Sequence, residues 1–348
     1  MIGILNIKRL LQTQCYKPLN ILKLFNGYSF TLLAIIFHLT YKCNLNCRMC
    51  ILAKKRNENH LSEDVLDWKI IKNVIDEICS FLFKPIIHFS GGEPLIHNDF
   101  LKICSYCGQK KLNWTITTNG FYLSDYAKEI VKYGCRCVNV SIDGTEEIHN
   151  LIRGSGNSYQ KAIDGIIKIA ELKKNNKRKA PLILATCTIN DKNHAHLKEI
   201  ADMFDSLPLD SFSFQHLSFG KDFIFGEDFN YEAVQDMDIE NLKNNINGIL
   251  NKNYYKPVFF VPYLRVKDIG AYYRDLNYDF GSSCINPWVM AEIKPNGKVI
   301  ICHREIGDIN INSLKEIWNS PEGRRVRHFI NKGVLSNRCL RCCHRRYK

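Results

Sequence analysis

The stretch "LTYKCNLNCRMC", residues 39–50, brings three cysteines close together in the chain, at Cys43, Cys47 and Cys50. An apolar run, "LLAIIFHLT" at residues 32–40, leads into it and predicts a buried strand. A disulfide needs two thiols, and a structural zinc site needs four ligands. Three thiolates can instead hold three corners of a four-iron cubane and leave the fourth iron open to a small molecule.

Strand-like and helix-like runs alternate beyond this stretch. This alternation predicts βα units and a parallel sheet, either open or curled into a partial barrel. We count six units rather than the eight of a full barrel. The strand candidates are residues 32–40, 86–90, 113–118, 137–143, 182–189 and 212–217. The helix candidates lie near residues 62–79, 98–111, 123–133, 158–174 and 194–206, the first of them beginning at Ser62.

The pattern changes after about residue 260. "WVMAEIKPNGKVIIC", residues 288–302, consists of two alternating runs around Pro295-Asn296-Gly297, which predicts a β-hairpin. The helix candidate "SLKEIWNS", a basic helix candidate and "CLRCCH" then follow. We therefore predict an N-terminal helical extension over residues 1–30, a partial barrel over 31–260 and a small second domain over 261–348.

The composition is that of an ordinary globular protein. Of 348 residues, 45% are hydrophobic and 24% are charged, which allows a large core. We find no export signal, and the longest apolar run, "LLAIIF", is too short to span a bilayer. The 15 cysteines are therefore expected to be thiols in a reducing, cytoplasmic compartment and to serve as metal ligands.

Positive charge gathers at the C-terminal end. The net charge is +13, and residues 321–348 hold nine lysines and arginines against the single Glu322. A basic tail can bind nucleic acid or an anionic substrate, but it can also be a solvated face that offsets thiolate charge. At the other end, "IGILNIKRLL" has apolar residues at helical spacing. We expect it to plug the open barrel, with peripheral contact to a membrane surface as the alternative.

The Cys43-x3-Cys47-x2-Cys50 loop after a first strand resembles that of the radical SAM enzymes. In that family the open iron of a [4Fe–4S] cluster chelates S-adenosylmethionine (SAM). Reductive cleavage of SAM gives a 5′-deoxyadenosyl radical, which abstracts hydrogen from an unactivated substrate carbon. The resemblance covers about residues 30–220. It implies an α/β fold, namely an incomplete (βα)6 TIM-like barrel with a small C-terminal hairpin-plus-helix domain that binds a cluster.

Further motifs at the predicted strand ends match SAM-binding elements of the same family. "GGEP", residues 91–94, combines glycines that allow close backbone approach with an acid that can pair with an ammonium group. "SIDG", residues 141–144, ends the fourth strand, and turn chemistry is its alternative explanation. Arg153 matches the position that meets the SAM carboxylate, although a surface salt bridge would also explain it. The implied SAM-binding residues are Gly91, Gly92, Glu93, Ser141, Asp143 and Arg153.

A second cysteine set lies in the last part of the chain. Cys284 and Cys302 flank the predicted hairpin, and Cys339-x2-Cys342 follows near the end. This arrangement resembles the twitch domain, the shorter form of the SPASM domain, and implies one auxiliary [4Fe–4S] cluster with Cys284, Cys302, Cys339 and Cys342 as its ligands. A structural zinc knuckle is the alternative, and "CLRCCH" offers Cys343 and His344 as spare ligands.

The resemblance implies a radical SAM oxidoreductase or maturase that carries out a net oxidation, with the auxiliary cluster accepting an electron. A maturase that forms a crosslink or thioether in ribosomally made peptides is one alternative. A basic RNA-binding protein with a zinc knuckle is an alternative of another class. We expect an external electron donor of the flavodoxin or ferredoxin type and a small-molecule or peptide substrate that is anionic. We do not expect a nucleic-acid partner. The sequence assigns no catalytic acid, base or hydrogen donor.

Overall fold

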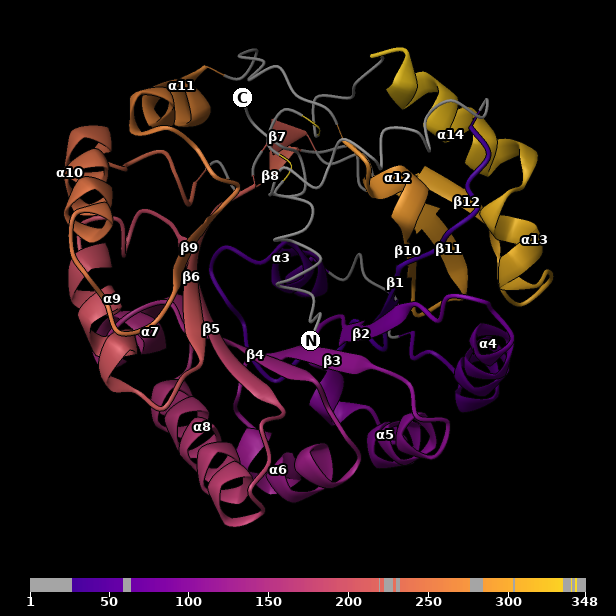
Figure 1. Ribbon diagram of the computed structural model, residues 1–348. Coiled ribbons are helices and arrows are strands. Elements are labelled where there is room, and N and C mark those ends of the chain that lie inside the picture. The colour runs from indigo at the N-terminus through magenta and orange to yellow at the C-terminus, as the bar shows by residue number, and fades with distance from the viewer. Residues whose placement is uncertain are drawn as a thin grey trace.

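The computed structural model in Figure 1 shows helices arranged around the outside of a curved sheet. It describes residues 27–58, 64–218, 232–275, 284–302 and 304–333, with residues 220–221 and 228–229, Cys339 and Cys342. Most of the predicted N-terminal extension lies outside these ranges. The helix start at Ser62 and the spare ligands Cys343 and His344 also lie outside the described residues.

One ten-stranded sheet runs through the described chain in the order β12-β11-β10-β1-β2-β3-β4-β5-β6-β9. Neighbouring strands from β10 to β9 pair in parallel, whereas the β10-β11 and β11-β12 pairs are antiparallel. The strands are β1 (Ala34–His38), β2 (Ile86–Ser90), β3 (Trp114–Thr118), β4 (Cys137–Ser141), β5 (Leu182–Ile189), β6 (Ser211–His216), β9 (Val258–Val261), β10 (Met290–Ile293), β11 (Lys298–Ile301) and β12 (Arg304–Asp308). A separate pair joins β7 (Gly220–Lys221) and β8 (Asp228–Phe229).

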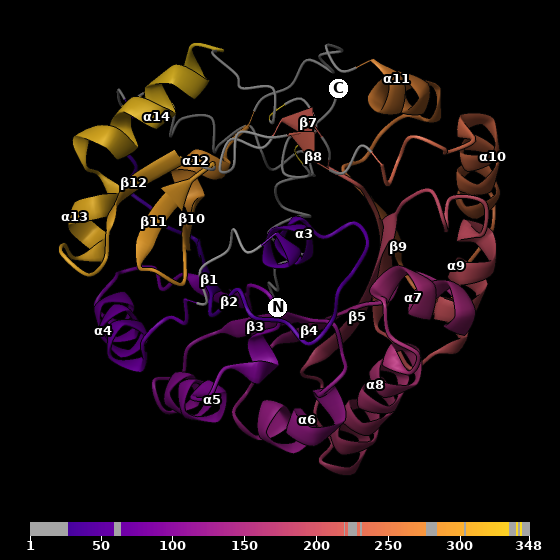
Figure 2. The same cartoon turned by 180° about the vertical axis from the view of Figure 1, so that it is seen from behind.

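Amphipathic helices cover the convex face of the sheet (Figures 1 and 2). In α4, for example, Ile71, Val74, Ile75 and Ile78 recur at helical spacing and are all buried. The barrel helices are α3 (Ile51–Asn57), α4 (Trp68–Cys79), α5 (Phe100–Gln109), α6 (Leu123–Lys132), α7 (Glu146–Arg153), α8 (Ser158–Asn175), α9 (Leu197–Ser206), α10 (Ile239–Leu250) and α11 (Ile269–Arg274). The C-terminal helices are α12 (Asn286–Val289), α13 (Leu314–Trp318) and α14 (Pro321–Asn331).

The two faces of the sheet differ in polarity, which fixes the inside of the barrel. In β2, Ile87 and Phe89 are buried in the main hydrophobic core, whereas His88 and Ser90 alternate with them and stay partly exposed. The same alternation places hydroxyl and amide side chains on the inner faces of β3 to β6. The barrel therefore has an apolar outer layer under the helices and a polar inner wall.

The prediction of an incomplete TIM-like barrel is confirmed, because the edge strands β12 and β9 do not pair with each other. The predicted ranges 86–90 and 182–189 match β2 and β5, and the other strand predictions are within three residues at either end. A further parallel strand, β9, follows the sixth predicted unit and pairs with β6. This strand gives no clear signal in the sequence, because "VFFV" is too short to show a period. Within the described residues, no helix is long and apolar enough to cross a membrane.

The C-terminal hairpin extends the barrel sheet, since β10 pairs with β1 in parallel. A second connection comes from α4, where the Glu77 carboxylate accepts hydrogen bonds from the backbone N–H groups of Leu314 and Lys315, at 2.9 and 2.7 Å. These are donors that the first turn of α13 leaves unpaired. The division at residue 260 stays a prediction, but the sheet itself runs unbroken from one predicted part to the other.

Candidate functional site

The loop with the first cysteine set connects the end of β1 to α3. Cys50 is the residue before the first turn of α3, and its N–H donates to the carbonyl of Cys47 at 3.0 Å. Arg56, one and a half turns into α3, donates to the backbone carbonyls of Leu45 and Tyr41 at 2.8 and 3.3 Å. The loop is therefore held against its own helix by backbone contacts, and the thiols remain available as ligands.

The GGEP loop after β2 packs directly on the start of the cysteine loop. The N–H of Gly92 donates to the carbonyl of Thr40 at 2.7 Å, and the N–H of Glu93 donates to that of Lys42 at 2.9 Å. A Cβ atom on Gly91 would lie 2.4 Å from the Thr40 oxygen, and one on Gly92 would lie 2.0 Å from the Lys42 oxygen. Gly91 also has φ +132, a conformation that only glycine adopts readily. These glycines let two loops touch backbone to backbone.

Glu93 is fully buried and binds the strand end next to its own. Its carboxylate accepts from the Thr118 hydroxyl at 2.7 Å, the Asn119 N–H at 2.8 Å and the Leu95 N–H at 3.0 Å. Burial nevertheless raises the pKa of Glu93 to about 7, because it outweighs the donated hydrogen bonds and the nearby charge of Arg153. The predicted acidic residue is thus in place at the ends of β2 and β3.

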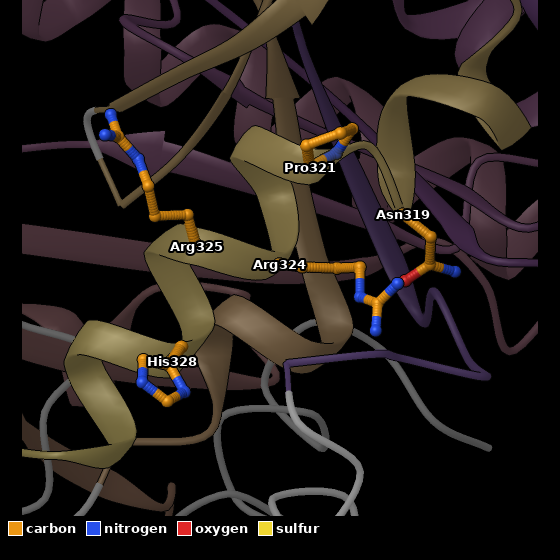
Figure 3. A pocket seen from close by; sticks show the side chains of 5 residues that line it. All are labelled: Asn319, Pro321, Arg324, Arg325 and His328. Atoms are coloured by element: carbon orange, nitrogen blue, oxygen red, sulfur yellow. The ribbon is translucent and has the colours of Figure 1, made fainter.

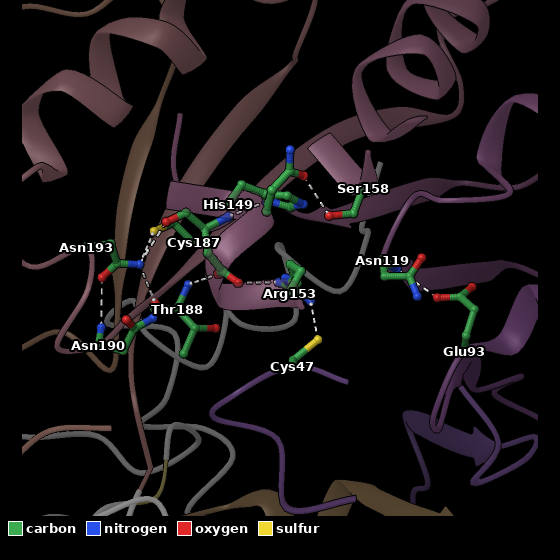
Figure 4. A network of polar contacts seen from close by, with 12 residues as sticks. Cys47, Glu93, Asn119, His149, Arg153, Ser158, Cys187, Thr188, Asn190 and Asn193 are labelled. Carbon is green, nitrogen blue, oxygen red and sulfur yellow. Dashed lines mark hydrogen bonds and ion pairs between the residues drawn. The ribbon is translucent and has the colours of Figure 1, made fainter. Parts of the chain in front are cut away.

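Arg153 connects the first cysteine set to the end of β4. Its Nη1 donates to the sulfur of Cys47 at 3.7 Å, and its Nη2 lies 2.6 Å from Oδ2 of Asp143 (Figure 4). Both Arg153 and Asp143 are buried, and burial raises the pKa of Asp143 although the arginine opposes the shift. The arginine is therefore a buried cation between a carboxylate and a thiol, rather than part of a surface salt bridge.

Both the carboxylate and the backbone of Asp143 form hydrogen bonds within the protein. Its Oδ1 accepts from the N–H of Thr188 at 2.8 Å, and its backbone carbonyl accepts from the Asn193 amide at 2.9 Å. Its own N–H donates to Nδ1 of His149 at 3.1 Å. Figure 4 shows Thr188 and Asn193 to one side of Arg153 and Asn119 and Glu93 to the other. The carboxylate has no exposed surface, whereas Ser141, the last residue of β4, is partly exposed. The predicted SAM contact of Asp143 stays a prediction beside this positioning role.

The donors around the first cysteine set suit an iron–sulfur cluster. Cys43 accepts from the Leu45 N–H at 3.5 Å and from the Asn119 amide at 3.7 Å, and Cys47 accepts from Arg153. Hydrogen bonds to sulfur tune the reduction potentials of such clusters. Burial raises the pKa of both thiols, that of Cys47 to about 11, so loading the site at neutral pH must release protons. In the described part of the chain, no three Cys, His, Asp or Glu side chains converge as they would around a single metal ion.

The second cysteine set is also assembled. Cys302, in a left-handed conformation with φ +48, ends β11 and forms a hydrogen bond with Cys284. The hydrogen bond with Cys284 and burial raise the pKa of Cys302, and the charges of Cys284, Cys342 and Cys339 raise it further, so these thiols act on one another electrostatically. The N–H of Cys342 donates to the carbonyl of Cys339 at 3.4 Å, so the knuckle between them is a tight turn. Four neighbouring cysteines are the ligand set that a closed cubane requires.

A chain of hydrogen bonds crosses the inner wall of the barrel from β2 to β6. His88 contacts Thr115 at 2.8 Å and Thr117 at 3.2 Å. The Asn139 amide then donates to Thr117 at 3.4 Å, while its oxygen accepts from Thr186 at 2.8 Å. Thr186 in turn contacts Ser213 at 2.9 Å. The wall thus presents imidazole, hydroxyl and amide groups.

One hydrogen-bonded pair lies at the edge of this wall. His38 on β1 is 2.7 Å from the Glu292 carboxylate on β10, and both side chains are partly exposed. The strand of His38 leads into the first cysteine set, and the strand of Glu292 leads through the hairpin to Cys302. The pair therefore lies on the connection between the two sets.

A basic groove lies on the outer side of α14. Figure 3 shows the side chains that line it: Asn319, Pro321, Arg324, Arg325 and His328. Arg325 also pairs with Glu322 at 2.9 Å. The predicted basic tail is thus in part an exposed face of one helix.

Several residues of the site were not among the predicted ligands. Asn119, which contacts Cys43 and binds Glu93, lies in "TTNG", residues 117–120, at the end of the third strand. Arg56, Thr188 and Asn193 contact residues 11 to 50 positions away in the sequence, a kind of contact for which a single sequence holds no signal.

Comparison with known families identifies two regions of the chain. The model of the Radical SAM superfamily matches residues 37–204, and that of SPASM, an iron–sulfur cluster-binding domain, matches residues 284–343. The first region contains Cys43, Cys47 and Cys50. The second contains Cys284, Cys302, Cys339 and Cys342. SAM with a [4Fe–4S] cluster, and an auxiliary iron–sulfur centre, are the cofactors of these two domains.

Individual relatives match this chain over different shares of its length. The chain is 29% identical over 184 residues to the Fe-coproporphyrin III synthase of Methanosarcina barkeri; the match covers 53% of this chain but only 43% of the synthase. It is 22% identical to the PqqA peptide cyclase of Bradyrhizobium diazoefficiens, over 89% of this chain and 78% of the cyclase. Streptococcus suis SuiB bound to the precursor peptide SuiA shares the fold, with a TM-score of 0.65 and 15% identity, over 90% of this chain and 69% of SuiB.

The backbone contact at Gly92 can be tested by adding a single methyl group. Because the new Cβ in Gly92→Ala would collide with the Lys42 carbonyl, we expect a loss of about 1–3 kcal/mol in the free energy of unfolding. The displaced cysteine loop should also bind less iron. Urea unfolding and iron analysis measure both effects. Gly156→Ala is the control, since no atom lies within 4 Å of its added Cβ. Equal behaviour of the two variants would contradict the packing argument.

The buried Glu93 should make stability depend on pH. A carboxyl whose pKa is higher in the folded than in the unfolded chain contributes stability at low pH, and this contribution is lost as the pH rises through the folded value. Because burial raises the pKa of Glu93 to about 7, the native chain should lose up to about 3 kcal/mol relative to Glu93→Gln between about pH 5 and pH 8. Urea unfolding at both values measures the difference. The exposed Glu147→Gln should show no such change, and a pH-independent difference for Glu93→Gln would contradict the assignment.

Proposed function

Since the chain belongs to the radical SAM superfamily and carries a C-terminal SPASM domain, we propose that it cleaves SAM reductively and abstracts hydrogen from an unactivated carbon of its substrate. The observation that carries this proposal is the assembly of Cys43, Cys47 and Cys50 beside Glu93 and Arg153 at neighbouring strand ends. When bound, the cluster and SAM would together supply the 5′-deoxyadenosyl radical. The protein's own residues bind and orient these groups.

The role of each residue in the first site follows from its charge and position. Cys43, Cys47 and Cys50 would ligate three irons. Glu93 is the acid near the loop and would face the amino group of SAM, with Gly91 and Gly92 shaping the backbone around it. Arg153 offers a cation beside Cys47, Ser141 is the partly exposed hydroxyl at the end of β4, and Asp143 fixes Arg153. These assignments extend the family pattern to the matching positions of this chain.

The second cysteine set supports a net oxidation. A substrate that loses a hydrogen atom becomes a radical, and a two-electron oxidation then requires one more electron and one proton to leave. Cys284, Cys302, Cys339 and Cys342 would hold an auxiliary cluster that takes the electron. A neutral His38, hydrogen-bonded to Glu292, would take the proton. An acidic electron carrier of the flavodoxin or ferredoxin type would supply the electron that starts each turnover.

The inner wall favours a peptide substrate. Its described side chains, Thr117, Asn139, Thr186 and Ser213, are neutral donors and acceptors that match backbone amides. Carboxylate-rich tetrapyrroles, by contrast, are bound best by arginine and lysine. A peptide cyclase among the relatives and a peptide-bound structure among the neighbours agree with this choice. The match to an iron–sulfur cluster-binding domain favours iron over the zinc knuckle of the RNA-binding alternative.

Loss of any first-set cysteine should abolish SAM cleavage. In Cys43→Ala, Cys47→Ala or Cys50→Ala, the cluster would lose one of three ligands, so 5′-deoxyadenosine should fall to background in an anaerobic assay with dithionite. Cys79→Ala, which changes a thiol on α4, is the matched control and should retain activity. If a first-set variant still formed 5′-deoxyadenosine, the assignment would be wrong.

The substrate class can be tested by co-expression with short peptides encoded beside the gene. We expect mass spectrometry to show a peptide that has lost two hydrogen atoms, and only with the native chain. The Cys43→Ala variant is the control for background oxidation. An unchanged peptide, together with consumption of an iron coproporphyrin by the native chain, would contradict the peptide proposal and favour the tetrapyrrole relatives.

A further inference from the structure

Arg327 lies in α14 with its side chain fully buried, although its neighbours Arg324 and Arg325 line the outer groove. Its Nε donates to the Pro287 carbonyl at 2.6 Å. Nη1 donates to the carbonyl of Gly27 at 3.1 Å and to the Asn319 amide oxygen at 3.2 Å, and Nη2 donates to the Trp318 carbonyl at 2.8 Å. Each of these acceptors is neutral. The N–H groups of Arg327 therefore have hydrogen-bond partners, but none of these partners carries a negative charge that would balance the guanidinium.

A buried charge without a counter-ion is costly, by several kcal/mol for a group of this size. Among the described residues, no carboxylate forms an ion pair with Arg327. The indole ring of Trp318, stacked 4.1 Å from the guanidinium carbon, offsets part of this cost through a cation–π contact. The remaining charge requires an anion nearby.

The second cysteine set is the source of negative charge next to Arg327. The Pro287 carbonyl that accepts from Nε is three residues beyond Cys284, on the short helix α12. Cys302 is the group whose charge acts on the guanidinium; it opposes the lowering of the Arg327 pKa by burial. The guanidinium thus contacts the helix that follows Cys284, and the charge of Cys302 acts on it.

We propose that Arg327 is the buried counter-cation of the cluster held by Cys284, Cys302, Cys339 and Cys342, and that it raises the reduction potential of that cluster. This inference rests on the auxiliary cluster of the proposed function. A cubane with four thiolate ligands is an anion, and reduction adds one more negative charge. A fixed cation in a dry environment therefore stabilises the reduced form more than the oxidised form.

This role matters for the proposed oxidation. A substrate radical passes its electron to the auxiliary cluster more readily when the reduced cluster is stabilised. Arg327 also couples the cluster to the fold, because its hydrogen bonds join α12, the end of α13 and the segment before β1. We infer that thiolate charge in the second set helps to hold α14 in place.

The test compares Arg327→Met, which removes the charge, with Arg327→Lys, which keeps it. Arg324→Met, on the outer side of the same helix, is the control. Each protein is reconstituted anaerobically, and a redox titration followed by electron paramagnetic resonance gives the auxiliary-cluster potential. We expect Arg327→Met to lower the equilibrium constant for reduction at least tenfold, equal to 59 mV for one electron. Arg327→Lys and Arg324→Met should stay close to the native value.

The outcomes separate this inference from the function on which it rests. If the native chain loses no iron when the four C-terminal cysteines are replaced, the auxiliary cluster itself is absent and the proposed oxidation fails. If the cluster is present and Arg327→Met keeps the native potential, the counter-cation role is overturned. Should Arg327→Met fail to load a cluster, loading of Arg327→Lys would support the role of charge. Failure of both variants would show that the hydrogen-bonding shape matters instead, which contradicts the proposal.

Discussion

The ion pair between Arg153 and Asp143 is the contact through which the rest of the first site is positioned. It joins the end of β4 to α7 at 2.6 Å, and Asp143 in turn fixes the end of β5 through Thr188. The other amino group of Arg153 reaches Cys47. Removing either partner of a buried ion pair leaves an uncompensated charge. Loss of Arg153 or Asp143 is therefore expected to lower the stability of the fold. A parallel sheet brings the ends of β1 to β5 to one rim, and the ion pair converts that proximity into a fixed arrangement around the cysteines.

The second cysteine set is likewise connected to the barrel through a strand. There the hairpin strand β10 pairs with β1, so the strand that precedes the first cysteine set also carries the connection to the second. Arg153 donates to the sulfur of Cys47, and Arg327 donates to the carbonyl of Pro287 on the helix that follows Cys284. Both arginines are buried, but Arg153 has a carboxylate partner whereas the acceptors of Arg327 are neutral. The two cysteine sets therefore lie in different electrostatic environments, which suits one centre that binds a small molecule and one that exchanges electrons.

Much of this arrangement could be predicted from local sequence. The strand ends, the two cysteine sets and the GGEP loop are short patterns with a direct physical meaning, and Glu93 lies where its motif predicts. Contacts between distant segments could not be predicted in this way. The pairing of β10 with β1 and the inward direction of Arg327 within a run of basic residues depend on tertiary packing. Asp143 and Glu93 both illustrate the limit, because their motifs indicated ligand contacts whereas the fold surrounds each carboxylate with protein.

The central claim is that the chain holds two separate four-iron clusters, one in each cysteine set. Anaerobic iron, zinc and sulfide analysis of the reconstituted protein tests it most directly, on the native chain and on a Cys43/Cys47/Cys50→Ala variant. Two cubanes predict about eight irons in the native chain and about four in the variant, with matching sulfide. About four irons falling to none, with zinc in both samples, would contradict the account, because the C-terminal cysteines would then hold a structural metal that cannot accept an electron.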